Sequence, residues 1–154
     1  MNKECTNLRE ELLSGKPVIL FTTGTSMQPL LYDKQKKHAT HVLVEPVSGT
    51  LAKGDLPIIQ LDDGRYMIHR IIQVGENNGD DYYVTRGDNC VGSERIKKEA
   101  VFGVVTEIYR KGKTIKVTDK GYLCYVKIWT FLYPMRRICK YVMGILVAIK
   151  RKLS

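Results

Sequence analysis

The sequence predicts a mainly β domain, an antiparallel coiled sheet or partial barrel, with a short N-terminal helix and a C-terminal amphipathic helical segment. Two observations predict the β class: the apolar runs are short, and turn-forming residues separate them at regular intervals. A third observation, the change to a long apolar and basic stretch near residue 120, predicts the helical end. We therefore expect an N-terminal helix over 1–16, a β domain over 17–119 and a basic tail over 120–154.

The N-terminal helix is predicted over residues 7–14, NLREELLS. Asn7 and Glu10 have the spacing of a capping box, and Gly15 is a stop signal. Three side chains share one face of this helix: Cys5, Leu8 and Leu12. The first 15 residues, MNKECTNLREELLSG, are charged throughout, so we expect no signal peptide in them.

Seven segments then have the length and pattern of strands. They are PVILFTT (17–23), HVLVEPV (41–47), DLPIIQL (55–61), RYMIHRIIQV (65–74), DYYVTRG (81–87), AVFGVVTEIYR (100–110) and TIKVTD (114–119). The turns at 62–64, DDG, and 111–113, KGK, predict two hairpins. Pro57 removes one ladder donor, which favours an edge position for its strand.

The tail reads as an amphipathic helix divided by Pro134. One side of the helical wheel is apolar: Met135, Ile138, Tyr141, Val142, Ile145, Leu146 and Ile149. The other side is basic: Arg136, Arg137, Lys140 and Arg151. A membrane span needs about 20 apolar residues, and a cation at its centre costs about 2.5–3.5 kcal/mol. A helix lying in a membrane interface fits the pattern better, and an amphipathic helix covering its own domain is the open alternative.

The chain carries 25 Lys and Arg against 16 Asp and Glu, a formal net charge of +9. The excess lies near the C-terminus, where Asp119 is the only acidic residue from Arg110 onward. This charge favours an anionic partner, and we expect an anionic membrane surface contacted through residues 122–154. No helix-turn-helix, RNA-binding aromatic pair or zinc motif is recognisable, so no specific nucleic-acid partner is expected.

The cysteine and histidine spacings predict no metal site and no cofactor. The chain has four cysteines: Cys5, Cys90, Cys124 and Cys139. None lies in a CxxC pair, which is typical of reduced, unpaired thiols. His38 and His41 have a His-x-x-His spacing, with Asp33 nearby, but KQKKHATHV is more typical of a solvated loop leading into a strand.

Three residues could together carry nucleophilic chemistry. Ser26 follows a glycine turn at the end of a predicted strand, His69 lies in YMIHRII, and Asp88 lies in TRGDNC. A serine hydroxyl needs a base to remove its proton, a neutral histidine can do so near pH 7, and a carboxylate can fix the histidine's tautomer. Each residue also has an ordinary structural interpretation, as a turn hydroxyl, a strand histidine and a turn-forming aspartate.

Five motifs resemble, in order, the boxes of type I signal peptidases and of the wider family that includes the self-cleaving SOS repressors. The motifs are GTSMQPLL, KGDLPIIQL, YMIHRIIQV, YVTRGDN and VFGVVTEIY, spread over residues 17–109. Histidine at the base position is similar to the endoplasmic-reticulum and sporulation-type branch. The resemblance implies a serine endopeptidase that cuts extended peptides after small residues. It makes Ser26 the nucleophile, His69 the general base and Asp88 the orienting acid.

The sequence departs from this family at three places. Ser93-Glu94 stands where histidine-type relatives often carry a second aspartate, so Glu94 is an alternative acid. Gly24 replaces a hydroxyl residue that helps to stabilise the oxyanion in many lysine-type relatives. That role then falls to the Ser26 N–H, with Thr25 or Thr23 as further candidates.

The third departure concerns the membrane anchor. Signal peptidases usually carry an N-terminal membrane helix, and here the C-terminal segment could replace it. We therefore expect a peripherally membrane-associated protein, on either side of the membrane. Met27 and Leu30 are candidates to line the substrate subsites. The alternative function is a non-catalytic membrane- or nucleic-acid-binding module on the same fold.

Overall fold

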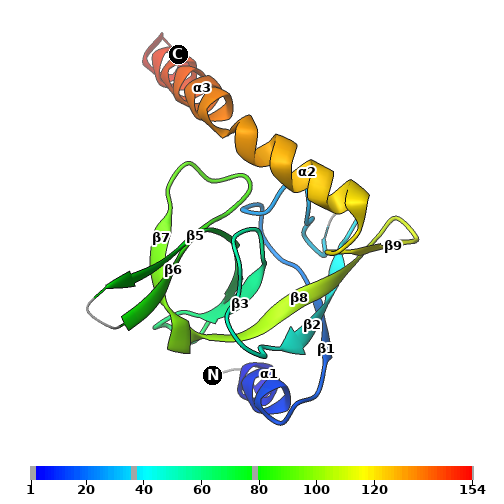
Figure 1. Cartoon of the computed structure of the whole chain (residues 1–154). Coiled ribbons are helices and arrows are strands. Elements are labelled where there is room, and N and C mark those ends of the chain that lie inside the picture. The colour runs from blue at the N-terminus through cyan, green and yellow to red at the C-terminus, as the bar shows by residue number, and fades with distance from the viewer. Residues whose placement is uncertain (1–2, 36–37, 78–79, 154) are drawn as a thin grey trace. The chain divides into compact units, whose positions relative to one another are not determined.

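The computed structural model describes residues 3–35, 38–77 and 80–153 (Figure 1). The chain divides into two compact units, Met1–Asp119 and Lys120–Ser154. The first is mainly β and contains a curled antiparallel sheet, so the predicted fold class is confirmed. The second is helical.

The larger sheet has six strands in the order β1-β2-β8-β3-β4, with β9 also paired to β8. Its strands are β1 (Val18–Phe21), β2 (His41–Pro46), β3 (Pro57–Gln60), β4 (Tyr66–Ile68), β8 (Val101–Arg110) and β9 (Lys113–Lys116). The long β8 joins the sheet together, because it pairs with β2, β3 and β9. Consequently β1 and β4, which are distant in sequence, are the two ends of this ladder.

A second sheet of three strands follows the order β5-β6-β7. Its strands are β5 (Arg70–Asn77), β6 (Asp80–Arg86) and β7 (Glu94–Lys97). The segment 65–74, predicted as one continuous strand, is instead divided at His69 between β4 of the first sheet and β5 of the second. His69 therefore lies where the chain passes from one sheet to the other.

The two predicted hairpins form. The β3–β4 pair is antiparallel, and Gly64 at its turn has a φ of 80°. The β8–β9 turn has positive φ at both Lys111 (51°) and Gly112 (70°), the combination that two-residue hairpin turns require. The edge position predicted for the strand that contains Pro57 is wrong, because β3 lies between β8 and β4. Pro57 is its first residue and precedes the pairing with β4, so no ladder hydrogen bond is lost.

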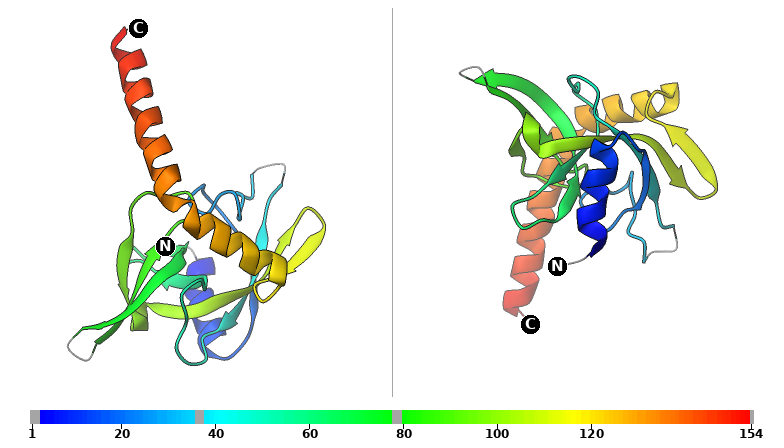
Figure 2. Two further views of the ribbon diagram at one scale, coloured as in Figure 1. Left: turned by 45° about the horizontal axis from the view of Figure 1, so that its top comes forward. Right: turned by 90° about the horizontal axis from the view of Figure 1, so that it is seen from below.

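The N-terminal helix α1 (Lys3–Leu13) packs against the first sheet, near β1, β2 and β8 (Figure 2). It begins earlier than predicted, so Asn7 lies inside the helix rather than at its cap. Leu8 and Leu12 are buried, 7% and 1% exposed, as expected for the apolar face. A short 3₁₀ helix, η1 (Lys98–Ala100), precedes β8.

The tail unit consists of α2 (Lys120–Phe131) and α3 (Tyr133–Leu153), which meet at an angle (Figure 2). Pro134 lacks the N–H that would continue the α2 ladder, which explains the break at this point. The Arg136 guanidinium strengthens the junction, since Nη2 donates to the Trp129 carbonyl at 2.7 Å and the group lies 3.8 Å from the centre of the Trp129 ring.

Candidate active site

Ser26 lies in the loop that follows β1. Gly24 opens this loop with a φ of 83°, a conformation that favours glycine, and its N–H donates to Asp33 Oδ2 at 2.6 Å. The buried Thr22 hydroxyl fixes the start of the loop by contacts with the Tyr32 and Thr40 carbonyls, at 2.8 and 3.0 Å. These contacts therefore hold the part of the loop that leads into Ser26 against residues 32, 33 and 40.

The turn at residues 87–90 anchors the same loop from the second sheet. The Asn89 N–H donates to the Ser26 carbonyl at 2.7 Å, and Asn89 Nδ2 donates to the Thr25 carbonyl at 3.1 Å. The Asp88 N–H lies 3.4 Å from the sulfur of Met27. These contacts join segments about sixty residues apart, so the position of Ser26 depends on the GDN turn.

The backbone carbonyl of Ser26 and the imidazole of His69 both lie close to Gly87. A Cβ built on Gly87 would lie 2.6 Å from the Ser26 carbonyl oxygen and 3.0 Å from His69 Nε2. A side chain at residue 87 would therefore displace one of them. Within the described residues no hydrogen bond joins the Ser26 hydroxyl to the imidazole. Catalytic hydrogen bonds often shorten only when substrate is bound.

Two carboxylates approach this centre and have different partners. Glu94, on β7, places Oε2 3.4 Å from His69 Nδ1. Asp88 instead forms a bidentate pair with Arg70, whose Nε and Nη2 donate to Oδ1 and Oδ2 at 2.8 and 2.7 Å. Both members of that pair are at most 5% exposed. The structure therefore brings the alternative acid, Glu94, beside the imidazole and engages Asp88 with a guanidinium.

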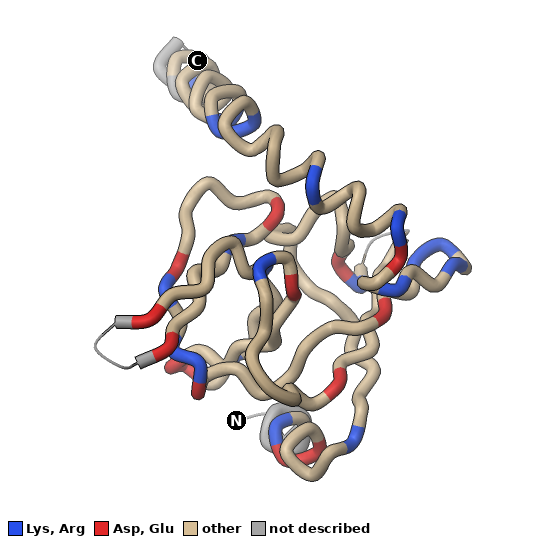
Figure 3. Tube along the Cα trace, viewed as in Figure 1, with Lys and Arg blue, Asp and Glu red and all other residues tan. Residues whose placement is uncertain are grey.

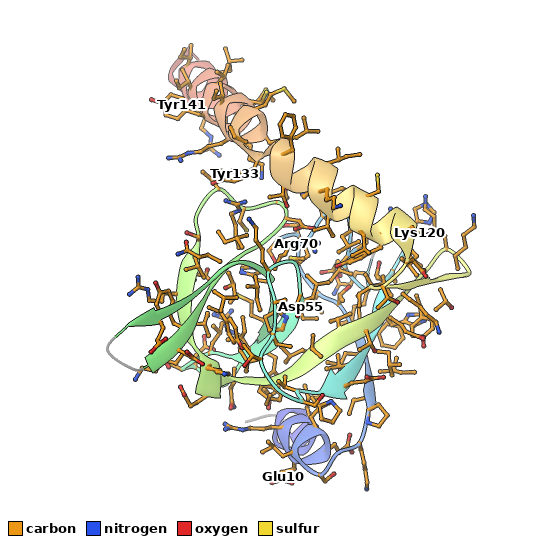
Figure 4. The ribbon with its side chains drawn as sticks, in the orientation of Figure 1. Glu10, Asp55, Arg70, Lys120, Tyr133 and Tyr141 are labelled. Atoms are coloured by element: carbon orange, nitrogen blue, oxygen red, sulfur yellow. The ribbon has the colours of Figure 1, made fainter. Side chains whose placement is uncertain are left out.

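Arg70 also joins this pair to the loop before β3. Its Nη1 donates to the Gly54 carbonyl at 3.0 Å, and the Ile71 N–H donates to the Asp55 carbonyl at 2.9 Å. Figure 4 labels Arg70 and Asp55 on these neighbouring segments. The residue after the histidine thus connects three of the motifs that the sequence singled out: KGD, MIHR and RGDN.

Burial lowers the pKa of His69 below its ordinary value, and the negative charges of Glu94 and Asp88 oppose this shift. His69 is only 5% exposed, so the charged imidazolium is poorly solvated there. A histidine with a lowered pKa is neutral at pH 7. Neutral imidazole is the form that a general base requires.

The backbone N–H of Ser26 is available as an oxyanion donor, since it donates to no group in the described parts of the chain. The Gly24 N–H is occupied by Asp33, and Gly24 has no hydroxyl to offer. Thr23 and Thr25 are exposed beside Ser26, so the structure leaves both predicted hydroxyl donors at the surface of the loop.

A cavity of about 540 Å³ adjoins Ser26 between the two end strands of the larger sheet. One wall is residues 20–24 and the other is residues 65–68. Its remaining lining residues are Leu8, Ser26, Met27, Leu31 and Ile58. Of the two predicted subsite residues, Met27 lines the cavity, whereas Leu30 is buried without lining it.

The polar residues weighed as metal ligands have other surroundings. Asp33 accepts hydrogen bonds from the Gly24 and Gln35 N–H groups. The His41 ring stacks on Tyr109 and lies tilted against Phe21. No cluster of three or more potential metal ligands was found within 3–35, 38–77 and 80–153.

Neither a scan against models of protein families nor a search of curated proteins found a match to this chain.

Sequence reasoning did not anticipate Leu8 and Leu31 in the cavity or Arg70 as the partner of Asp88. Leu8 was predicted only as part of the apolar face of a helix, because no local pattern shows what such a face covers. The sequence did contain a signal for Arg70, since it lies between apolar residues of a predicted strand. A buried arginine requires a partner, so an acidic partner could have been expected.

Proposed function

We propose that the chain is a serine endopeptidase of the signal-peptidase-like type, acting through Ser26 and His69. The observation that carries the proposal is the convergence of the Ser26 segment and His69 Nε2 on Gly87, with Glu94 beside the opposite nitrogen. A serine is activated by a histidine base whose second nitrogen faces a carboxylate, and Ser26, His69 and Glu94 would take these three roles. The cavity beside Ser26 supplies a place for an extended peptide.

In the proposed reaction, Ser26 Oγ attacks the scissile carbonyl carbon while His69 Nε2 accepts the hydroxyl proton. The Ser26 N–H stabilises the oxyanion of the tetrahedral intermediate. His69 then gives the proton to the leaving amine as the C–N bond breaks. A water molecule, deprotonated by His69, hydrolyses the acyl-enzyme. The two end strands of the larger sheet, β1 and β4, would bind the peptide by strand addition.

The test is covalent labelling with a peptidyl fluorophosphonate that carries alanine beside the phosphorus. The native protein is expected to gain one adduct, placed on Ser26 by mass spectrometry of the digested protein. Ser26→Ala and the heat-unfolded chain are expected to gain none, because reaction requires the assembled site. Labelling at another serine, or equal labelling of Ser26→Ala, would contradict the proposal.

The tail supports a second activity, binding to an anionic membrane surface. The predicted apolar side of α3 is exposed, from 44% at Ile145 to 72% at Tyr141. Residues 120–154 contain no acidic residue, and Figure 3 shows Lys and Arg recurring along α2 and α3. The described part of the chain contains no helix long and apolar enough to cross a membrane. An interfacial helix with a peripheral location suits these properties.

Liposome co-sedimentation tests this binding. The full chain is expected to pellet with vesicles containing anionic lipid, and a chain ending at residue 119 to remain in the supernatant. Ile145→Glu should weaken binding by tenfold or more, since burying such a side chain contributes about 1.5–3 kcal/mol. Gly144→Glu is the matched control: it adds the same charge one residue away, outside the apolar side, and should weaken binding far less. Equal effects of the two variants would exclude the proposed face.

A non-catalytic binding module is the rival interpretation of the same fold. It predicts membrane binding with no labelling of Ser26. The two experiments above therefore separate the rival from the enzyme without knowledge of the natural substrate.

A further inference from the structure

The N-terminal helix contributes to the cavity beside Ser26. Leu8 of α1 and Ile58 of β3 both line the cavity, and they are 7% and 0% exposed. Phe21 in the wall is 62% exposed by comparison. The buried lining residues, which are the farthest from solvent, form the deep end of the cavity; they are Ile58, Leu31, Met27, Leu8 and Thr22.

Contacts on both sides of Leu8 hold α1 in place. Arg9 Nη1 donates to Gln60 Oε1 of β3 at 2.6 Å. Leu12, 1% exposed, packs against β8, where a Cβ built on Gly103 would lie 3.1 Å from Leu12 Cδ1. Glycine at residue 103 thus allows the close approach of the helix. Leu8 is consequently a fixed part of the cavity wall.

The chemistry of the cavity selects apolar side chains. Four of its deep residues carry aliphatic or thioether groups: Leu8, Met27, Leu31 and Ile58. The fifth, Thr22, has its hydroxyl in contact with backbone carbonyls. Arg65 is the only charged lining residue in the described parts of the chain, and it pairs with the exposed Asp63 at 2.7 Å. A charged substrate side chain would therefore lose its hydration in the deep end without gaining a partner.

We propose that Leu8 sets the size limit for the apolar substrate side chain that binds beside Ser26. This inference rests on the proposed peptidase function. The isobutyl group of Leu8 forms part of the deep end, so its truncation opens space for a longer side chain, and its enlargement removes space. α1 is then a determinant of specificity as well as part of the core.

The experiment compares Leu8→Ala with Leu12→Ala, which truncates a neighbouring buried leucine outside the cavity. For each variant, kcat/KM is measured on peptides that differ only in having Leu or Ala on the acyl side of the cleaved bond. The Leu-to-Ala ratio is independent of how much protein is folded. We expect Leu8→Ala to raise the ratio by about tenfold or more, and Leu12→Ala to leave it unchanged. Leu8→Val, a smaller truncation, should raise it in the same direction.

A binding measurement separates this inference from the peptidase proposal. In the Ser26→Ala background, fluorescence anisotropy of the same labelled peptides reports the side-chain preference of the cavity without cleavage. A shift towards Leu on adding Leu8→Ala supports the inference even if the wild-type chain cleaves nothing, an outcome that would overturn the peptidase. Cleavage with unchanged ratios in all Leu8 variants would overturn the inference alone. Neither binding nor cleavage of any peptide would overturn both.

Discussion

Ser26→Ala and His69→Ala should each lower kcat/KM for peptide hydrolysis by about 10⁴–10⁶-fold, the range seen when a member of a serine triad is removed. The proposed mechanism gives the reason for so large an effect. The Ser26 segment and His69 Nε2 converge on Gly87, and burial lowers the pKa of His69 so that the imidazole is neutral at pH 7. The hydroxyl loses its base in one variant, and the base has no nucleophile to activate in the other.

The double variant should lose little more activity than either single variant, because the two groups act as one unit. His38→Ala is a suitable control, since His38 is exposed and does not line the cavity. The measurement is steady-state cleavage of a quenched peptide, with circular dichroism to confirm the fold. Full activity in Ser26→Ala would exclude Ser26 as the nucleophile.

The β class could be predicted further than the pairing of its strands and side chains. Short alternating strands and turn residues were enough for the β class, because these signals are local. The break at His69 was not predictable from RYMIHRIIQV, which contains neither glycine nor proline. It arises because Tyr66–Ile68 pair with β3 while Arg70–Asn77 pair with β6, and such pairing partners are set by distant segments.

The strand β7 was missed for a related reason. ERIK has one buried residue among four and no apolar alternation that would mark a strand. It is extended because it pairs with β6 through Tyr82–Thr85. This pairing is what brings Glu94 to His69 Nδ1, so the structure was needed to find which carboxylate lies beside the imidazole.

Asp88→Ala should lower the free energy of unfolding by about 3–5 kcal/mol, because it leaves the Arg70 guanidinium buried without its counter-charge. Both side chains of the pair are at most 4% exposed, so solvent screens the interaction little. The double variant Arg70→Met/Asp88→Leu removes both charges and should recover part of the loss. Urea denaturation at pH 7 measures these differences.

Glu94→Gln is the matched control for this prediction. Its side chain is 54% exposed, so the free energy of unfolding should change by no more than about 0.5 kcal/mol. Catalysis should respond instead, with kcat/KM reduced by about tenfold or more as the imidazole loses its orienting charge. Because the negative charge of Glu94 raises the pKa of His69, removing it lowers that pKa further. The acidic limb of the pH profile should therefore move to lower pH.

The two variants together assign the roles of the two carboxylates. If Glu94 orients His69 and Asp88 secures the turn that holds Ser26, kcat/KM falls in Glu94→Gln, and the loss in Asp88→Ala is mainly one of stability. If Asp88 were the orienting acid, folded Asp88→Asn would show the fall in kcat/KM at the pH optimum, while Glu94→Gln would keep the wild-type rate there. Both negative charges raise the pKa of His69, so either variant should move the acidic limb to lower pH, and the loss of rate at the optimum identifies the orienting acid.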